Sequence, residues 1–239
     1  MIESFVQFVS QYDPSFPARI QGASNEEIDA LALLLGRSLP ASYREFLTAM
    51  GHSDGDLDLA FDGSMKISDV IDYYREIARG QFPPAPPNCI VIGTGDPALG
   101  EVYLEVVSDR EEPRVLLGVD GQIGQLYGES LPKVLFRRAF IKYELARKPW
   151  SGFYIDRKVR DLVSLMREAA SEEGFEPLWF SDSIALCARR DEVVLIVEWY
   201  PKTLGLLKLA AGKREEVEQI GSLFSERLRL QFREWWRRG

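Results

Sequence analysis

Two stretches of helical periodicity, joined by a leucine-proline step between residues 24 and 51, constrain the fold of this chain more than any other feature. Ser24 is followed three residues later by Glu27, the capping-box arrangement that satisfies backbone N–H groups at a helix start. Apolar side chains then recur at helical spacing up to Gly36, at Ile28, Leu31, Ala32 and Leu35. The spacing predicts a helix over about residues 25–35, ended by the glycine.

A second helix is predicted directly after the first. Pro40 disfavours helical backbone at Leu39, so the chain has to be extended at this step. Helical spacing resumes beyond it and ends at Gly51, with apolar positions at Tyr43, Phe46, Leu47 and Met50. Two short amphipathic helices with so tight a connection form a helical hairpin, and we expect their apolar stripes to bury against each other. A third helix is predicted over about residues 68–79.

From Cys89 onward the periodicity becomes that of β-strands. Short β-rich segments occupy residues 89–93, 102–107 and 114–119, and QIGQLYG follows at 122–128. Asp120-Gly121, between the last two segments, is a strong signal for a two-residue hairpin turn. These features predict an antiparallel meander, followed by a helix from Ser130 to about residue 146. The fold class is therefore α+β, and the break at Lys148-Pro149 divides the chain into domains at 1–148 and 149–239.

The remainder is interpreted as a smaller α+β lobe. We expect a helix over about 156–173, strands around 177–180, 184–188, 193–200 and 206–210, and a last helix that carries Val217, Ile220, Phe224, Leu228, Phe232 and Trp235. All five tryptophans lie in the last ninety residues. Trp179 and Trp199 are expected in the core of this lobe, and Trp236 is the best candidate for an exposed contact residue.

Net charge argues against broad nucleic-acid binding. The 239-residue chain carries 29 Lys and Arg against 37 Asp and Glu, a formal charge of −8, which gives phosphate backbones little to bind. The acids are concentrated early: residues 1–133 hold 21 acidic and 9 basic residues, whereas residues 134–239 hold 16 acidic and 20 basic ones. We expect an acidic first domain and no nucleic-acid partner.

Residue types suited to catalysis are few. His52 is the only histidine, and imidazole serves most general acid-base sites and many metal sites. Cys89 and Cys187 lie inside apolar runs, where a thiol serves as a small buried side chain, and this usage is typical of a reducing compartment. The N-terminus lacks a basic region of the secretory type, and no apolar run is long enough to span a bilayer. We expect a cytoplasmic protein with no catalytic residue, no cofactor and no membrane contact.

Two loops begin like known ligand sites and then fail their requirements. The turn at residues 93–95 would need a further glycine at position 98, where Ala98 stands, and a following helix, so we interpret it as a turn between strands. Residues 54–58 (DGDLD) begin like a calcium loop, but Leu59 and Met65 stand where that loop needs glycine and a bidentate glutamate. No metal site is predicted. A weak divalent-ion site in this acidic loop, and a Cys-His pair, stay open as alternatives.

The segment at residues 26–56 resembles the signature of the SUKH superfamily, the Smi/Knr-type domain named after a fungal cell-wall-synthesis regulator. That signature is an acidic and apolar helix, a Leu-Pro step, and a Tyr-x-x-Phe-Leu helix that ends near a glycine and an acidic loop. The matching residues are Leu35-Gly36, Leu39-Pro40, Tyr43, Phe46-Leu47 and Gly51. Two later segments agree with the family pattern in the same order. They are VIGTGDPALGEVYLEV, which resembles the family's glycine-and-aspartate turn between strands, and LYGESLPKVLFRRAF, which resembles its closing helix. The resemblance covers about residues 20–145 and implies a SUKH-like hairpin packed on the meander.

The resemblance implies a non-enzymatic binding protein, because bacterial members of the superfamily are thought to be immunity proteins that neutralise toxins, often nucleases. The expected partner is a cognate toxin domain, which the chain would occlude. Two alternatives stay open: an intracellular regulatory or scaffolding adaptor, and a carboxylate-metal hydrolase. The candidate partner-binding residues are acids in segments expected to be exposed, with one tryptophan: Asp54, Asp56, Asp58, Asp62, Asp96, Glu101, Asp109, Glu111, Glu112 and Trp236.

Overall fold

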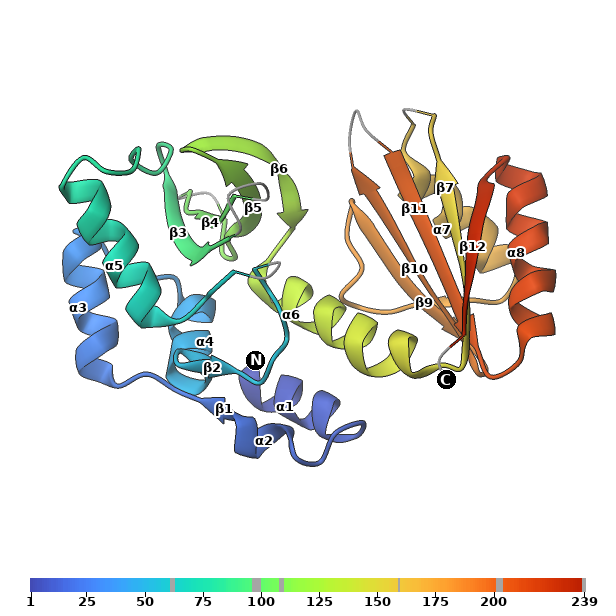
Figure 1. Ribbon diagram of the computed structural model, residues 1–239, viewed down its shortest axis with the longest axis horizontal. Helices are drawn as coiled ribbons and strands as arrows, with labels where there is room; N and C mark the ends of the chain where they lie inside the picture. Colours follow the sequence, from blue (N-terminus) through green and yellow to red (C-terminus); the bar gives the residue numbers. More distant parts are fainter. Residues whose placement is uncertain (61–62, 96–99, 108–109, 159, 201–203, 238–239) are drawn as a thin grey trace. The chain divides into compact units, whose positions relative to one another are not determined.

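A computed structural model of the chain divides into two compact units, Met1–Arg138 and Ala139–Gly239 (Figure 1). The structure describes all residues except 61–62, 96–99, 108–109, 159, 201–203 and 238–239, and it leaves out the side chains of residues 236 and 237. The division falls inside a continuous helical segment, which begins as α6 (Leu131–Ala139) and continues through a π-helical turn (Phe140–Glu144) and a 3-10 turn (Leu145–Arg147). Each unit is described by itself below.

The first unit combines helices with a four-stranded meander. Before α6, its helices are α1 (Ile2–Ser10), α2 (Phe16–Arg19), α3 (Asn25–Leu35), α4 (Ala41–Met50) and α5 (Ile67–Ala78). Its strands are β1 (Ile20–Gln21) and β2 (Ser53–Asp54), which pair antiparallel, and β3 (Cys89–Thr94), β4 (Glu101–Glu105), β5 (Arg114–Val119) and β6 (Gln122–Gly128). The latter four form an antiparallel sheet in chain order, which confirms the predicted meander.

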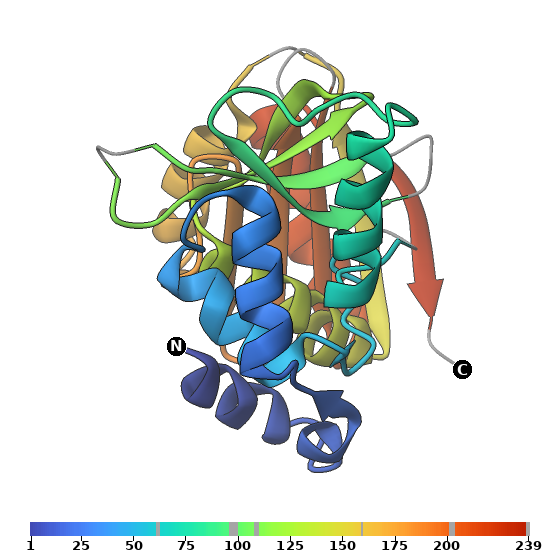
Figure 2. The same cartoon turned by 90° about the vertical axis from the view of Figure 1, so that its left-hand side faces the viewer.

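The helical hairpin is present where the sequence predicts it. The Ser24 hydroxyl accepts from the Glu27 N–H, the Glu27 carboxylate accepts from the Ser24 N–H, and Gly36 ends α3 in the left-handed conformation. Ile28 and Leu31 of α3 and the predicted stripe of α4 are buried. The third helix, α5, contacts both α3 and β3, and Figure 2 shows it beside α3 and below the strands.

The meander closes its last hairpin with the predicted turn. Asp120 and Gly121 have φ angles of 51° and 73°, the left-handed pair that a two-residue hairpin turn requires. Tyr73 of α5 packs with Val91, Tyr103 and Leu116 on one face of the sheet. This small cluster joins α5 to three neighbouring strands.

The two helices at the N-terminus were not predicted from the sequence. Phe5 of α1 is fully buried, and its ring meets those of Phe16 and Phe136 edge-on, with centroids 5.9 and 5.3 Å apart. The first 20 residues therefore close the core of the first unit beneath α6.

The second unit is a six-stranded antiparallel sheet in the order β12-β7-β11-β10-β9-β8. The helices α7 (Leu162–Glu172) and α8 (Arg214–Leu228) pack on one face and share a single core with it. The strands are β7 (Trp150–Asp156), β8 (Glu176–Pro177), β9 (Ala185–Arg190), β10 (Val193–Tyr200), β11 (Leu204–Ala211) and β12 (Gln231–Arg237).

The end of the chain corrects the sequence prediction of one long last helix. The chain leaves α8 at Leu228, because Arg229 adopts a left-handed conformation (φ 53°), and returns as β12 along β7. Phe232 and Trp235 therefore lie on an edge strand, where Trp235 stands opposite Gly152. A Cβ at position 152 would lie 2.9 Å from the Trp235 ring, so the glycine makes room for it. Pairing with β7 overrides the helical spacing.

Three further expectations in this unit were wrong. The helix expected from residue 156 begins only at Leu162, after β7 (Trp150–Asp156) has ended. Residues 179 and 180 lie in a turn rather than a strand, so that Trp179 is 60% exposed instead of being in the core. Trp199 is half-buried and packs against the core cluster.

Candidate functional site

The acidic loop, residues 54–58, leaves β2 in an unusual backbone conformation. Gly55, Asp56 and Asp58 adopt left-handed backbone conformations, with φ angles of 68°, 66° and 53°. Aspartate tolerates this conformation better than most residues. The Oδ1 atom of Asp54 accepts the Asp56 N–H at 3.0 Å, which fixes the first turn. The three aspartates that the sequence singled out are therefore brought together by the local backbone.

Two arginines offset part of the negative charge of this loop. An Asp56 carboxylate oxygen lies 3.6 Å from Arg19 at the end of α2, and one of Asp58 lies 2.9 Å from Arg138 of α6. Both aspartates are solvent-exposed, so each ion pair stabilises the fold only slightly. The pairs nevertheless hold the carboxylates in place. The loop is an ordered surface with both signs of charge at its base.

Two shallow hollows flank the acidic loop. One, of about 200 Å³, is lined by Met50, His52, Ser53, Asp54, Asp56, Gly63, Ser64, Met65 and Lys66. The other, of about 280 Å³, is lined by Asp54, Asp56, Asp58, Leu59, Ala60, Gly63 and Met65. Both are small beside the clefts that enclose drug-sized ligands. Their shape suits a side chain of a partner better than a cofactor.

Glu101, at the start of β4, lies elsewhere on the first unit and is half-buried. Its two carboxylate oxygens accept the hydroxyl protons of Tyr73 and Tyr103, each at 2.9 Å. Burial, and then this hydrogen bond, raises the pKa of both tyrosines well above the usual value. The two phenols therefore stay neutral donors and hold Glu101 in one orientation.

The other candidate residues are dispersed. Glu111 and Glu112 are exposed in the bend before β5. Asp62, Asp96 and Asp109 lie outside the described residues, and Trp236 lies in β12 with its side chain outside them. The structure thus brings together Asp54, Asp56 and Asp58 and leaves the other described acids at separate positions on the first unit.

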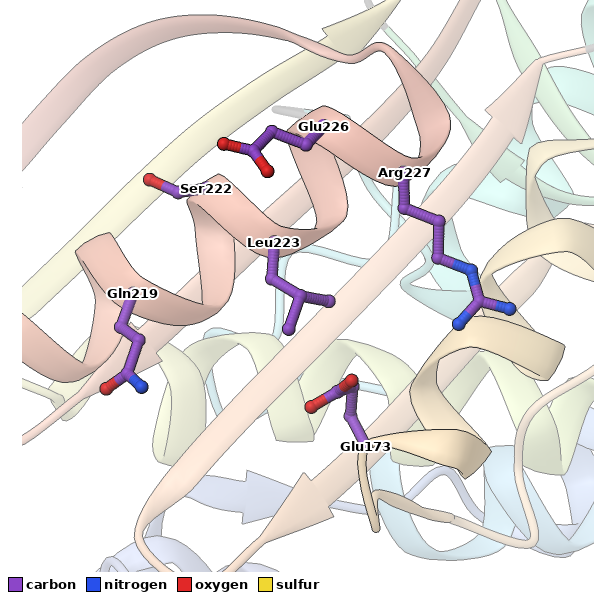
Figure 3. A pocket seen from close by; sticks show the side chains of 6 residues that line it. All are labelled: Glu173, Gln219, Ser222, Leu223, Glu226 and Arg227. Atoms are coloured by element: carbon purple, nitrogen blue, oxygen red, sulfur yellow. The ribbon is translucent and has the colours of Figure 1, made fainter.

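A hollow in the second unit lies along α8, next to the residue that follows α7 (Figure 3). It has a volume of about 650 Å³ and is lined by Glu173, Gln219, Ser222, Leu223, Glu226 and Arg227. In Figure 3, Leu223 and Arg227 extend from α8 toward Glu173. Arg227 forms an ion pair with Glu172, which lowers the pKa of that carboxyl. With a single apolar side chain, this hollow lacks the lining of a small-molecule site.

The groups left to consider for chemistry are the metal-ligating side chains, the two cysteines and His52. In the described part of the chain, no three His, Cys, Asp or Glu side chains gather closely enough to hold a metal ion. Cys187 is buried, and burial raises the pKa of the half-buried Cys89 thiol, which disfavours the reactive thiolate. The Nε2 atom of His52 lies 3.0 Å from Glu27 at the start of α3, where it supports the hairpin.

Sequence reasoning missed several exposed apolar side chains. Phe82 and Ile123 are 44% and 42% exposed, Trp179 is 60% exposed, and Leu33 is 83% exposed. The sequence gave one signal for this exposure, the proline-rich loop that contains Phe82. Such a loop runs over the surface, so an apolar side chain within it is exposed.

The first unit is an acidic α+β unit in which a helical hairpin and a four-stranded meander occur together. Comparison with protein families identifies this part of the chain: residues 22–131 match the SMI1 / KNR4 family (SUKH-1), and the chain carries a domain of this family over those residues. The family includes immunity proteins. No curated protein matches the chain. Within the described residues, no helix is long and apolar enough to cross a membrane.

Proposed function

We propose that this chain is a non-enzymatic immunity protein that binds a cognate bacterial toxin in the cytoplasm and occludes it. The observation that carries the proposal is the coincidence of the SMI1 / KNR4 family (SUKH-1) domain with the acidic part of the chain. Residues 1–138 contain 21 acidic and 11 basic residues, a formal charge of −10. A toxin that acts on nucleic acid presents a basic surface to phosphates, and an acidic protein is attracted to the same surface.

The electrostatic part of this proposal concerns the rate of association. Complementary charge steers two proteins together and raises the association rate constant, with an effect that salt weakens. The exposed Glu111 and Glu112 are suited to test it, because their replacement disturbs no described contact that holds the fold. Replacing the aspartates of the acidic loop also changes its backbone, since the Asp54 carboxylate accepts the Asp56 N–H, so charge and structure change together.

The test is a protection assay in bacteria with the toxin gene found next to the gene of this chain. We expect co-expression of the chain to restore growth, and the purified pair to associate faster at low salt than at physiological salt.

Two sets of variants test the steering. They are Glu111→Gln with Glu112→Gln, and Asp54→Asn with Asp56→Asn and Asp58→Asn. The control for the glutamate pair makes an equal charge change in the second unit, Glu215→Gln with Glu216→Gln. If both acidic sets associate like the parent at low salt, the steering mechanism is wrong. If the parent protects against no toxin, the function itself is wrong.

The exposed Trp179 favours the second candidate function, a regulatory or scaffolding adaptor. Tryptophan dominates binding hot spots and is seldom left 60% exposed without a reason. An adaptor would use this side chain of the second unit to recruit another protein. The test is a Trp179→Ser variant. The adaptor is supported if this variant protects against the toxin as well as the parent does but no longer binds a second protein that the parent binds.

A further inference from the structure

The loop after α5 and the turn between β5 and β6 lie on the first unit, where their backbones can be followed in Figure 1, and exposed apolar side chains gather at these two segments. These side chains are Phe82, Pro83, Pro84 and Ile123, all exposed, and we call them the proline-loop patch. The loop and the turn are in contact, since a Cβ placed on Gly121 would lie 2.8 Å from the Pro84 carbonyl oxygen and 3.3 Å from Pro83.

The strand register places Ile123 on the same face as the rest of the patch. Ile123 stands opposite Gly118, and Gly118 stands opposite Glu101, whose carboxylate holds Tyr73. The Phe82 ring stacks on Tyr73 with centroids 4.9 Å apart and an interplanar angle of 14°. Val119, also exposed, lies on the other face of the hairpin by the same register. The patch is therefore one surface rather than four scattered side chains.

The patch is held in place before any partner binds. Phe82 rests on Tyr73, Tyr73 donates to Glu101, and Glu101 is held from its other oxygen by Tyr103. Four prolines between Phe82 and Asn88 restrict the loop backbone, and Asp120 and Gly121 form a left-handed pair in the turn. A surface that is already ordered loses little conformational entropy on binding, which raises affinity.

The charge around the patch identifies the kind of partner. Asp120 is exposed in the turn itself, three positions before Ile123, the Glu101 carboxylate accepts from the Tyr73 hydroxyl, and the first unit as a whole carries a formal charge of −10. A second copy of this unit would bring like charges together. A basic protein surface would instead place cations beside Asp120 while apolar side chains cover Phe82 and Ile123.

We propose that the proline-loop patch is the apolar anchor with which this chain binds a basic protein partner, and that Asp120 at its rim steers that partner. The inference rests on the proposed function, because the partner it commits to is the cognate toxin domain. Apolar anchors determine mainly the dissociation rate, whereas rim charges determine mainly the association rate. The two parts of the patch therefore have separable kinetic effects.

The experiment measures binding kinetics between the full chain and the purified toxin domain encoded beside it, made inactive by mutation. We expect Phe82→Ser and Ile123→Ser each to weaken binding at least about tenfold, through faster dissociation. Asp120→Asn keeps a residue that favours the left-handed turn and should slow association about two- to fivefold at low salt and have little effect at high salt. Circular dichroism and thermal unfolding show whether each variant is folded.

Each variant has a matched control. Leu33→Ser removes an equally apolar and more exposed side chain from α3, and Asp191→Asn makes the same change at another left-handed turn residue, between β9 and β10. We expect both to bind like the parent. If the parent binds the toxin and folded Phe82→Ser and Ile123→Ser variants bind equally well, the patch is not the anchor, although the proposed function stands. If the parent itself does not bind, both proposals fail.

Discussion

The Nε2 atom of His52 lies 3.0 Å from the Oε2 atom of Glu27, and the same oxygen accepts the Ser24 N–H at 2.9 Å. One carboxylate thus closes the capping box of α3 and contacts His52, the second residue after the end of α4. The sequence indicated the capping box but gave His52 no part in it, because the two residues are 25 positions apart. The contact makes the helical hairpin dependent on the ionised form of Glu27.

The first prediction concerns the pH dependence of this contact. The Ser24 N–H, and then His52, lower the pKa of Glu27 below its ordinary value of 4.5. A carboxyl group with a lowered pKa in the folded state stabilises the fold fully above that ordinary value, and the contribution is lost as the pH falls through the lowered one. We expect Glu27→Gln to be less stable than the parent at about pH 7 and equally stable at about pH 3. Urea unfolding at both pH values measures the difference.

Glu26→Gln is the control for this prediction, since Glu26 neighbours Glu27 and its carboxylate takes no part in the capping box. It should show a much smaller loss of stability at neutral pH. A deficit of Glu27→Gln that is unchanged at acid pH would mean that size or packing, rather than charge, makes Glu27 important.

The second prediction tests the core of the hairpin. Phe46 is fully buried and its ring stacks with that of Tyr43, with centroids 6.2 Å apart. We expect Phe46→Ala to lower the free energy of unfolding by about 3–5 kcal/mol, because it leaves a cavity in a packed core. Leu33→Ala, at the exposed face of α3, should cost less than about 0.5 kcal/mol. A loss below about 1 kcal/mol for Phe46→Ala would show that this side chain is not part of the core.

How far the sequence predicts this fold depends on how local the determining interactions are. The hairpin was predictable because its signals, the capping box, Gly36 and the Leu-Pro step, act within a few residues of where they stand. The turn at Asp120-Gly121 was predictable for the same reason. β12 was not, because Phe232 and Trp235 keep a helical spacing and only pairing with β7 determines their strand conformation.

The candidate site shows the same division. Sequence identified the acids but could not indicate that Asp58 lies 2.9 Å from Arg138, a residue 80 positions away, or that two tyrosines bind Glu101. The sequence did not indicate the proline-loop patch, because its side chains are joined by two tertiary contacts. These are the stacking of Phe82 on Tyr73 and the contact of the proline loop with the turn at Gly121. These are tertiary relationships, and the proline-rich loop around Phe82 was the one local signal for any of them.

The third prediction compares two reasons why a position requires glycine: a left-handed backbone conformation, and a neighbouring atom too close to allow a Cβ. Gly121 has a φ of 73°, and a Cβ there would meet the Pro84 carbonyl oxygen at 2.8 Å, whereas Gly36 has a φ of 62° with nothing near a Cβ. Gly36→Ala should therefore cost about 1 kcal/mol for the left-handed conformation alone. Gly121→Ala should cost about 1 kcal/mol more, since the proline loop also has to move. Denaturant unfolding of both variants measures this, and equal losses would contradict the close approach of loop and turn.

The last prediction concerns the residue that ends α8 and sends the chain back as β12. Arg229 adopts a φ of 53° and a ψ of 46°, and the next N–H, that of Leu230, donates to the Ser225 carbonyl at 3.1 Å. Glycine takes this conformation without the steric cost that a Cβ brings. We expect Arg229→Gly to raise the free energy of unfolding by about 0.5–1 kcal/mol, an uncommon direction for a substitution.

Arg227, two residues earlier and still inside α8, supplies the opposite case. It forms an ion pair with Glu172, and Arg227→Gly adds flexibility within a helix, so this variant should lose about 1 kcal/mol. Thermal and urea unfolding of the two glycine variants side by side therefore give opposite signs. A destabilised Arg229→Gly would show that the arginine side chain, rather than its backbone conformation, determines where α8 ends, and β12 would then depend on contacts of that side chain.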